Sequence, residues 1–355
     1  MATFKKFVRP DAPMRAITSS RDLDLIEAVL RYRFSPTSEL VRLVGGNQDV
    51  TQRRLRTLWT RDILNRFAFP KIPNHGEFIY YIDAKKTLEL LVDHDRLSMI
   101  HPKMEDEVRM NSEADYAGAA AAGQHMKLGF LKHALMISRL HFMLEMASRS
   151  SNGEVAVTQW RQGAELRGNK VQVPELTSKR ITGSNEYHWE ESDRTFRLPV
   201  EPDALFTLRF ARRPADNQLV HFCYEADRGS MPMADMLKKF RAYHHFIKRQ
   251  QKHREAFGVH PIRAVLVETT DEARARKLME LAEHPGVIGQ GKRSALFWFT
   301  ISPVFTRSIN DSSPRVLPEY LHRPTLIMER SWVLPDRTML SLADVENSIT
   351  SPQTR

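Results

Sequence analysis

The spacing of apolar side chains in the first hundred residues predicts short helices followed by two strands. In the segment 19–34, Leu23, Ile26 and Val29 fall on one helical face, behind serines that can cap the helix. Two glycines end the second helix, and a loop rich in proline and glycine joins the two strands. The expected elements are helices over 19–34, 35–45 and 47–64, strands over 66–72 and 76–83, and a closing helix over 84–97.

This order of elements is typical of a winged helix, in which the third helix enters the major groove of DNA. Residues 49–71 include six lysines and arginines against two acids. Such side chains reach phosphates or guanine edges, so the pattern favours DNA binding over a merely solvated helix. A protein–protein role, which winged helices also have, stays open. The expected DNA contacts of this unit are Arg53, Arg54, Arg56, Thr57 and Arg61.

The apolar pattern changes after residue 100 and separates two parts of the chain. Residues 105–124 are rich in alanine, glycine and acids, so the segment 101–127 is expected to be a linker or a loose helical connector. An almost entirely apolar helix over 129–149 then opens the second part and is expected to be buried. The expected organisation is a winged-helix domain over 1–100, a linker over 101–127, a second domain over 128–335 and a disordered tail over 336–355.

Alternating strands and helices in the second part predict a mixed sheet covered by helices. The predicted order is helix, three strands, helix and strand, followed by further elements. The fold class is therefore α/β or α+β, with an N-terminal winged helix and a second domain of αβββαβ order. The expected strands are 154–162, 203–210, 218–226, 262–270 and 295–302, and the expected helices between them are 234–253 and 271–283.

Three acids lie at the ends of two of these strands. Asp203 begins one strand, while Glu225 and Asp227 end the next. Adjacent strands would bring these carboxylates together as ligands of Mg²⁺ or Mn²⁺, which polarises a phosphodiester and generates hydroxide from bound water. The simpler alternative is a solvated strand end.

Several segments, taken in order, make the chain similar to a known family. The winged-helix pattern and the segments FLKHALMISRLHFML, EPDALFTL, CYEADRGS and VLVETTDEARARKLMELA resemble the replication–relaxation family of plasmid proteins. The pair Pro202 and Asp203, the later Glu-x-Asp and the αβββαβ order look like the PD-(D/E)XK nuclease superfamily. The resemblance covers roughly residues 20–305. It implies a bacterial protein that acts in the replication or relaxation of plasmid or other mobile DNA.

One departure from the nuclease pattern bears on activity. The nuclease motif is Glu-x-Lys, whose lysine stabilises developing charge, whereas this chain has Asp227 in the place of the lysine. Lys238 of the following helix is the expected substitute, and Arg228 and Lys239 are alternatives. A DNA-binding protein on a nuclease-like scaffold is therefore favoured over an active endonuclease. The expected catalytic residues are Asp203, Glu225, Asp227 and Lys238, of which the three acids are also the expected metal ligands.

The segment 228–254 is strongly basic, with eight lysines and arginines against one acid. So concentrated a charge favours a polyanionic partner over a solvated helix, and in a nuclease-like fold this helix would flank the acids. The expected contacts with the DNA backbone are Arg228, Lys239 and Arg241.

Composition agrees with a DNA partner and excludes other classes of protein. The 355 residues carry a formal net charge of +10. The single cysteine, Cys223, excludes a disulfide framework and a zinc site built on cysteines. The sequence shows no membrane span or secretory signal, so a cytoplasmic location is expected.

Double-stranded DNA is the expected partner. A replication protein or relaxase is a further expected partner, and a homodimer stays an open alternative. A winged-helix transcriptional repressor, whose second domain only dimerises, is the third functional alternative after the DNA-binding protein and the endonuclease.

Overall fold

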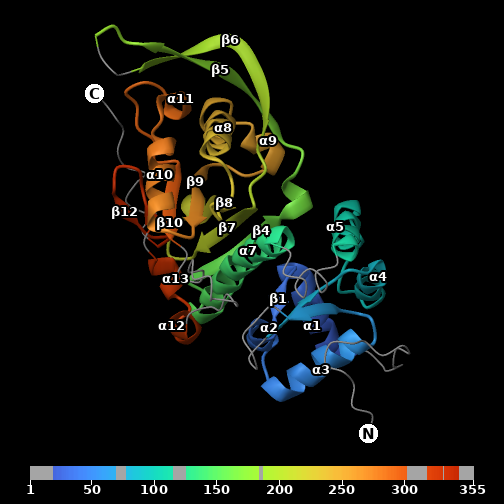
Figure 1. Ribbon diagram of the computed structural model, residues 1–355. Helices are drawn as coiled ribbons and strands as arrows, with labels where there is room; N and C mark the ends of the chain where they lie inside the picture. The colour runs from blue at the N-terminus through green and yellow to red at the C-terminus, as the bar shows by residue number, and fades with distance from the viewer. Residues whose placement is uncertain are drawn as a thin grey trace. The chain divides into compact units, whose positions relative to one another are not determined.

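The chain forms two compact units whose division falls inside the long helix α7 (His125–Ser150). Figure 1 labels the elements of both units. Unit 1 comprises residues 1–142 and 308–315, and unit 2 comprises residues 143–307 and 316–355. The computed structural model describes residues 19–68, 77–114, 125–183, 187–301, 318–330 and 332–343.

Unit 1 follows the order of elements that the sequence predicts for the first hundred residues. Three helices with one short strand precede a hairpin, and the three strands form a sheet in the order β1-β3-β2. Both strand pairs are antiparallel. The elements are α1 (Ser20–Tyr32), β1 (Ser35–Pro36), α2 (Thr37–Val44), α3 (Gln48–Thr60), β2 (Asn65–Ala68), β3 (Phe78–Tyr81) and α4 (Lys85–Asp93).

Local signals and a shared core together explain why these helices form. Ser19 and Asp22 form a capping box at the start of α1, and the Asn47 side chain accepts from two backbone N–H groups at the start of α3. Apolar positions that recur once per turn then pack the helices against one another. The buried core of unit 1 includes Leu25, Ile26, Val29, Leu40, Leu55, Leu58, Leu88 and Leu91.

Part of the predicted linker is a helix, α5 (Pro102–Glu113). Val108 lies in the core of unit 1, and Asn111 Nδ2 donates to the Ile82 carbonyl at 2.8 Å. These contacts join residues that are distant in sequence. With Val108 as its one deeply buried apolar side chain, α5 shows almost no helical periodicity of apolar positions in the sequence. Residues 115–124 of the expected linker lie outside the described residues.

Unit 2 is built on a seven-stranded mixed sheet in the order β12-β11-β10-β9-β8-β7-β4. β4, β7 and β8 are antiparallel neighbours, and β9 and β10 continue the sheet in parallel with β8. With α7 before β4 and α8 between β8 and β9, the predicted αβββαβ order is present, and the α+β class is confirmed. The strands are β4 (Val155–Gln162), β7 (Ala204–Phe210), β8 (Leu219–Ala226), β9 (Ile262–Thr269) and β10 (Phe297–Ile301).

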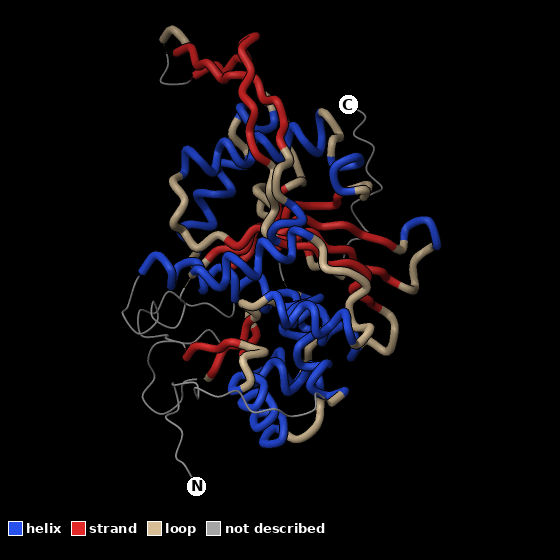
Figure 2. The backbone as a smooth tube through the Cα atoms, turned by 90° about the vertical axis from the view of Figure 1, so that its right-hand side faces the viewer, coloured by secondary structure: helices blue, strands red, loops and turns tan. Residues whose placement is uncertain are grey.

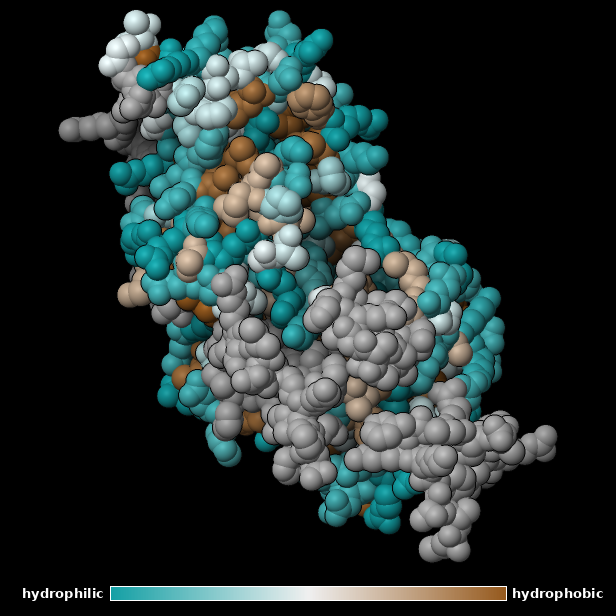
Figure 3. Space-filling view, in the orientation of Figure 1, coloured by the Kyte–Doolittle hydropathy of each residue, from teal (hydrophilic) through white to brown (hydrophobic). Residues whose placement is uncertain are grey.

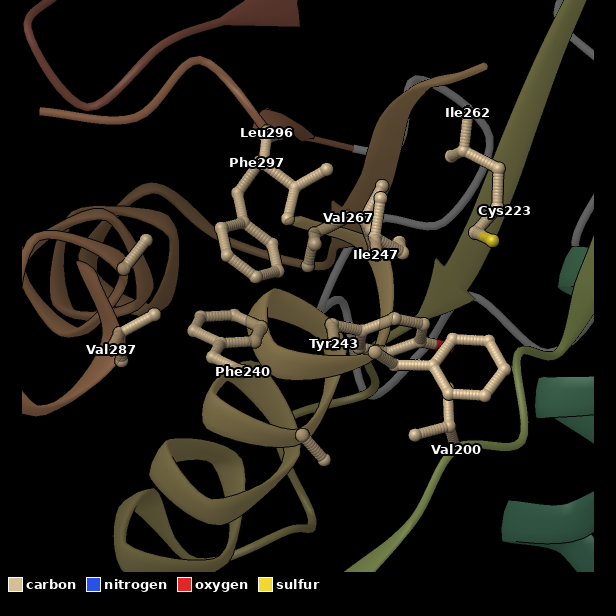
Figure 4. Close-up of a cluster of buried hydrophobic side chains, with 14 of the residues drawn as sticks. Val200, Cys223, Phe240, Tyr243, Ile247, Ile262, Val267, Val287, Leu296 and Phe297 are labelled. Carbon is tan, nitrogen blue, oxygen red and sulfur yellow. The ribbon is translucent and has the colours of Figure 1, made fainter. Parts of the chain in front are cut away.

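The helices that follow β8 cover one face of this sheet. Figure 4 shows Phe240 and Tyr243 of α8 among Cys223, Val267 and Phe297 of the strands. In this covered part of the sheet, β8 and β9 are buried along almost their whole length. The helices are α8 (Met233–His244), the π-helical turn η3 (His245–Arg249), α9 (His253–Phe257), α10 (Glu272–Ala282) and α11 (Pro285–Ile288).

The part of the chain that connects β4 to β7 forms a two-stranded antiparallel ribbon, which extends from unit 2 as Figures 1 and 2 show. Its strands are β5 (Lys170–Arg180) and β6 (Tyr187–Pro199), and 3-10 turns lie at η1 (Gly163–Leu166) and η2 (Ala215–Asn217). The ribbon is anchored to α8 by Arg241, whose Nη2 donates to the Pro174 carbonyl at 2.5 Å. Arg249 adds a pair of bonds to Glu191 at 2.7 and 2.8 Å.

The first part of the predicted disordered tail is ordered. β11 (Trp332–Val333) pairs with β10, and β12 (Met339–Leu340) pairs with β11. Leu342 is fully buried, so residues 336–343 belong to unit 2. The expectation was wrong for this stretch because its order comes from pairing with a distant strand, and residues 344–355 lie outside the described residues. Two short helices, α12 (Pro318–His322) and α13 (Leu326–Glu329), precede β11.

The described surface is predominantly hydrophilic on the face that Figure 3 shows. Among the described residues, no helix is long and apolar enough to cross a bilayer. Cys223 is fully buried, and burial raises the pKa of its thiol. It therefore serves as a small apolar side chain of the core.

A buried ion pair joins α7 to α2 within unit 1. Arg139 Nε lies 2.9 Å from Glu39 Oε1, and the two side chains are only 3% and 5% exposed. The preceding residue, Ser138, donates from its Oγ to the Phe34 carbonyl at 2.9 Å. Removing one partner of such a pair leaves a buried charge uncompensated.

We expect Arg139→Met to lower the free energy of unfolding by about 3–5 kcal/mol. Arg149→Met on the same helix is the matched control, because Arg149 pairs with Glu145 at a far more exposed position. That control should cost no more than about 0.5 kcal/mol. Denaturant unfolding of the full chain, followed by circular dichroism, measures both, and equal losses would contradict the stabilising role of the buried pair.

Candidate functional site

The two strand ends that carry the predicted acids are neighbours in the sheet. β7 is antiparallel to β8, so Asp203, just before β7, lies beside the end of β8. The Asp203 N–H donates to the Tyr224 carbonyl at 3.0 Å, and the Ala226 N–H donates to Asp203 Oδ2 at 2.8 Å. These bonds fix the Asp203 carboxylate next to Glu225.

Glu225 is 3% exposed, and two side chains of α8 hold its carboxylate. The Lys239 ammonium donates to one oxygen and the Tyr243 hydroxyl to the other. Lys239 and Tyr243 are four residues apart, so they share one face of the helix. Burial, opposed by the Lys239 charge and assisted by the Asp203 charge, raises the pKa of Glu225 to about 7.

The lysine that lies beside the acids is Lys239, whereas the sequence analysis expected Lys238 there. Lys238 is 62% exposed, and its ammonium pairs with Asp235 at 2.9 Å on the outer side of α8. One residue along a helix turns the side chain by about 100°, which separates the two lysines. Burial lowers the pKa of Lys239, but the Glu225 and Asp203 carboxylates outweigh burial and raise it. Lys239 is therefore a cation beside the two acids.

Asp227 is held by a different cation. Arg274 of α10 donates to both of its oxygens, at 2.9 and 3.0 Å, and Thr269 Oγ1 donates at 2.9 Å. A bidentate guanidinium neutralises a carboxylate and fixes its orientation. Asp227 thus links the end of β8 to α10, and both of its oxygens are occupied.

The three acids do not form a three-ligand metal site. Within the part of the chain that the structure describes, no three His, Cys, Asp or Glu side chains are placed to hold a metal ion. Lys239 supplies the positive charge beside Asp203 and Glu225, and Arg274 supplies it at Asp227. This arrangement does not fit Mg²⁺ or Mn²⁺ held jointly by all three carboxylates.

Arg241, another predicted contact of the basic segment, has interior partners. Arg241 is only 7% exposed, and besides the Pro174 carbonyl its guanidinium binds the Gly286 carbonyl at 2.9 Å. It was expected to contact DNA, but it fastens the ribbon and α11 to α8 instead. Arg228 is half-buried, and burial lowers its pKa.

In unit 1 the predicted DNA-binding residues separate into two groups. Arg53 and Arg56 are exposed on α3, and Thr57 is half-buried with its hydroxyl bonded to the Arg53 carbonyl at 3.0 Å. Arg54 instead pairs with Asp22 at 2.9 Å and so ties α3 to α1. Arg61 is half-buried at the C-terminal cap of α3.

Sequence reasoning did not single out Tyr243 or Arg274. The four-residue spacing between Lys239 and Tyr243 is a signal that could have identified the tyrosine. For Arg274 we find no such signal, because it is 47 residues from Asp227 and on another helix.

Comparison with known proteins gives one match. A model of the family described as replication-relaxation matches residues 27–261 of the chain. The matched region contains α3, Asp203, Glu225 and Lys239, and it ends just before β9. No curated protein and no solved structure matches the chain.

The raised pKa of Glu225 predicts a pH dependence of stability. The value in the folded protein, about 7, exceeds the ordinary value of 4.5, so the folded state holds this proton more tightly. The contribution to stability is fully present below pH 4.5 and is lost as the pH rises towards 7.

We therefore expect wild type to lose roughly 3 kcal/mol of unfolding free energy relative to Glu225→Gln across that window. Denaturant unfolding at several pH values measures the difference. Glu255→Gln, at an exposed position of α9, is the matched control. A difference between wild type and Glu225→Gln that stays constant with pH would show that Glu225 does not titrate in this way.

Proposed function

We propose that this chain, which belongs to the replication–relaxation family, acts by binding double-stranded DNA of a plasmid or other mobile element. Membership of the family supports a role in replication or relaxation. The observation that carries the proposal of DNA binding is the exposed pair Arg53 and Arg56 on α3, the third helix of unit 1.

The packing of α3 explains why this pair faces outward. Leu55, Leu58 and Trp59 lie in the core of unit 1, so the opposite side of the helix is left to polar residues. Arg53 and Arg56 are three residues apart and share that outer side. In a winged helix, this is the surface that enters the major groove, where arginines bind phosphates or the O6 and N7 atoms of guanine.

Two further arginines hold the surrounding structure in place. Arg54 fastens α3 to α1 through Asp22. Arg66 of β2 lies between the rings of Trp59 and Phe78, 3.8 and 3.9 Å from their centroids, and so attaches the hairpin to α3. A fixed relation between the recognition helix and the hairpin is what simultaneous contact with a groove and its backbone requires.

We expect Arg53→Ala combined with Arg56→Ala to weaken binding of duplex DNA at least tenfold. The slope of log K against log salt should also become shallower by about 2, because each lost phosphate contact removes roughly 0.9. Fluorescence anisotropy with a labelled duplex at several salt concentrations measures both.

The matched control is Arg31→Ala combined with Arg109→Ala, which removes the same charge from exposed positions on other helices of unit 1. If both double variants bound DNA equally well, α3 would not be the recognition helix.

A second candidate function is metal-dependent cleavage of DNA. One observation favours it: Lys239 brings an ammonium group to Asp203 and Glu225, and aspartate, glutamate and lysine are the residues that the PD-(D/E)XK pattern combines. Against it, the carboxylates that would bind a metal ion already accept hydrogen bonds from cations: Glu225 from Lys239, and Asp227 from Arg274. DNA binding on a nuclease-like scaffold therefore remains the better supported function.

Incubation with supercoiled plasmid separates the two functions. A DNA-binding protein without nuclease activity should leave the plasmid uncut in Mg²⁺ or Mn²⁺ and give the same gel shift in EDTA. An endonuclease should nick it only with metal, and should lose that activity in Glu225→Gln and Lys239→Met. Lys238→Met is the matched control, since its ammonium lies on the outer side of α8.

A further inference from the structure

Several cations of unit 2 gather at the end of the sheet opposite to Asp203 and Glu225. Asp203 precedes β7 and Glu225 ends β8, whereas the end of β7 and the starts of β8 and β9 lie at the other end. Arg213 follows β7, and Arg263 is the second residue of β9. Arg263 lies beside His221 and Phe222 of β8, so at about 3.3 Å per residue it is roughly 10–13 Å from Glu225 along the strand.

Aromatic rings and an imidazole hold these arginines in place. The Arg263 guanidinium lies 5.2 Å from the Trp298 ring centroid, and that of Arg213 lies 4.2 Å from the Phe210 ring centroid. Arg254 Nη2 lies 2.6 Å from His260 Nε2. All of these contacts are with uncharged groups, provided that His260 is neutral.

The hydrogen bonds of His260 require the neutral form. A guanidinium only donates, so His260 Nε2 must accept from Arg254. The proton of the imidazole is then on Nδ1, which lies 3.1 Å from His253 Nε2. Burial and the charges of Arg254 and Lys248 also lower the pKa of His260. The charge of Arg254 is therefore not compensated by its partner.

Lys248, Arg254 and Arg263 form no ion pair with any carboxylate that the structure describes. Lys248 and Arg254 are exposed, while the Nε and Nη2 atoms of Arg263 are buried without a hydrogen-bond acceptor. Buried donors normally have a partner, and leaving them without one destabilises the folded state.

The cations also act on one another. Although Lys248 is exposed, the side chains packed around it partly desolvate its ammonium and lower its pKa, and the Arg263 charge lowers it further. Burial lowers the pKa of Arg263 in the same way, with the Arg213 charge adding to it. An anion placed among these side chains would relieve the repulsion and supply the missing acceptors.

We propose that Lys248, Arg254 and Arg263 form a second DNA-contacting surface that binds the phosphodiester backbone of duplex DNA. This proposal rests on the proposed function of DNA binding, and it adds a contact in unit 2 that does not involve Glu225. The surface binds phosphates and does not read bases. The rings of Trp298 and Phe210 are buried, so they are not available for stacking on unpaired bases.

The chemistry favours a nucleic-acid backbone over an acidic protein. Protein interfaces are centred on exposed aromatic or apolar anchors, whereas here the aromatic side chains are covered and the exposed side chains are those of Lys248 and Arg254. A row of phosphates offers acceptors to several cations at once, and it releases counterions when it binds.

The test compares full-length wild type with Lys248→Gln, Arg254→Gln and Arg263→Gln combined. We expect duplex DNA of unrelated sequences to bind at least tenfold more weakly to the variant at moderate salt. The slope of log K against log salt should become shallower by about 2–3. The matched control combines Arg276→Gln, Lys277→Gln and Arg293→Gln, which removes three exposed cations elsewhere in unit 2.

The outcomes separate this proposal from the proposed function. If wild type binds DNA and both triple variants bind alike, the second surface is refuted and DNA binding stands. If wild type binds no duplex DNA at all, both proposals fail. Should the triple variant not fold, Lys248→Gln with Arg254→Gln changes only exposed side chains, and a slope shallower by about 2 is then expected. An unchanged slope in that double variant also refutes the second surface.

Discussion

The burial of a carboxylate at the end of β8 determines how this edge of unit 2 is arranged. An ionised carboxylate is costly to bury unless charge and hydrogen bonds compensate it. Glu225 obtains both in part from one face of α8, through Lys239 and Tyr243, and these contacts hold the helix against the sheet while burial still raises the pKa of Glu225 to about 7. Asp227 obtains them from Arg274, which holds α10 in the same way. Lys239 and Arg274, the cations nearest to the acids, therefore stabilise the fold through these contacts.

This commitment decides which cations remain available for the proposed contacts with DNA. In the basic segment 228–254, Lys239 neutralises Glu225 and Arg241 fastens the ribbon. Lys248 and Arg254 lie beyond α8, at the opposite end of the sheet. In unit 1, Arg54 is likewise used inside the fold, and its neighbours Arg53 and Arg56 stay exposed. A high density of positive charge in a sequence therefore indicates a polyanionic partner without identifying which side chains reach it.

The order of elements was predictable from the sequence because apolar periodicity is local, and the resemblance to the replication–relaxation family is confirmed by the match over residues 27–261. The choice between Lys238 and Lys239 was harder, because it depends on the rotation of α8, which is set by the burial of Met236, Phe240 and Tyr243. The partner of Asp227 was not predictable, since tertiary packing alone brings α10 to β8. The same reason explains why β12 was missed and why the segment of α5 was expected to be only a linker or a loose helical connector: each is stabilised by contacts distant in sequence.

The most direct test of DNA binding is to titrate a labelled duplex with the full-length protein in EDTA at several salt concentrations. We expect saturable binding that weakens linearly in a plot of log K against log salt and does not change when Mg²⁺ is added. Binding that requires a metal ion would contradict the conclusion that Lys239 and Arg274 already supply the positive charge at the acids. The absence of binding in every condition would contradict the proposed function itself.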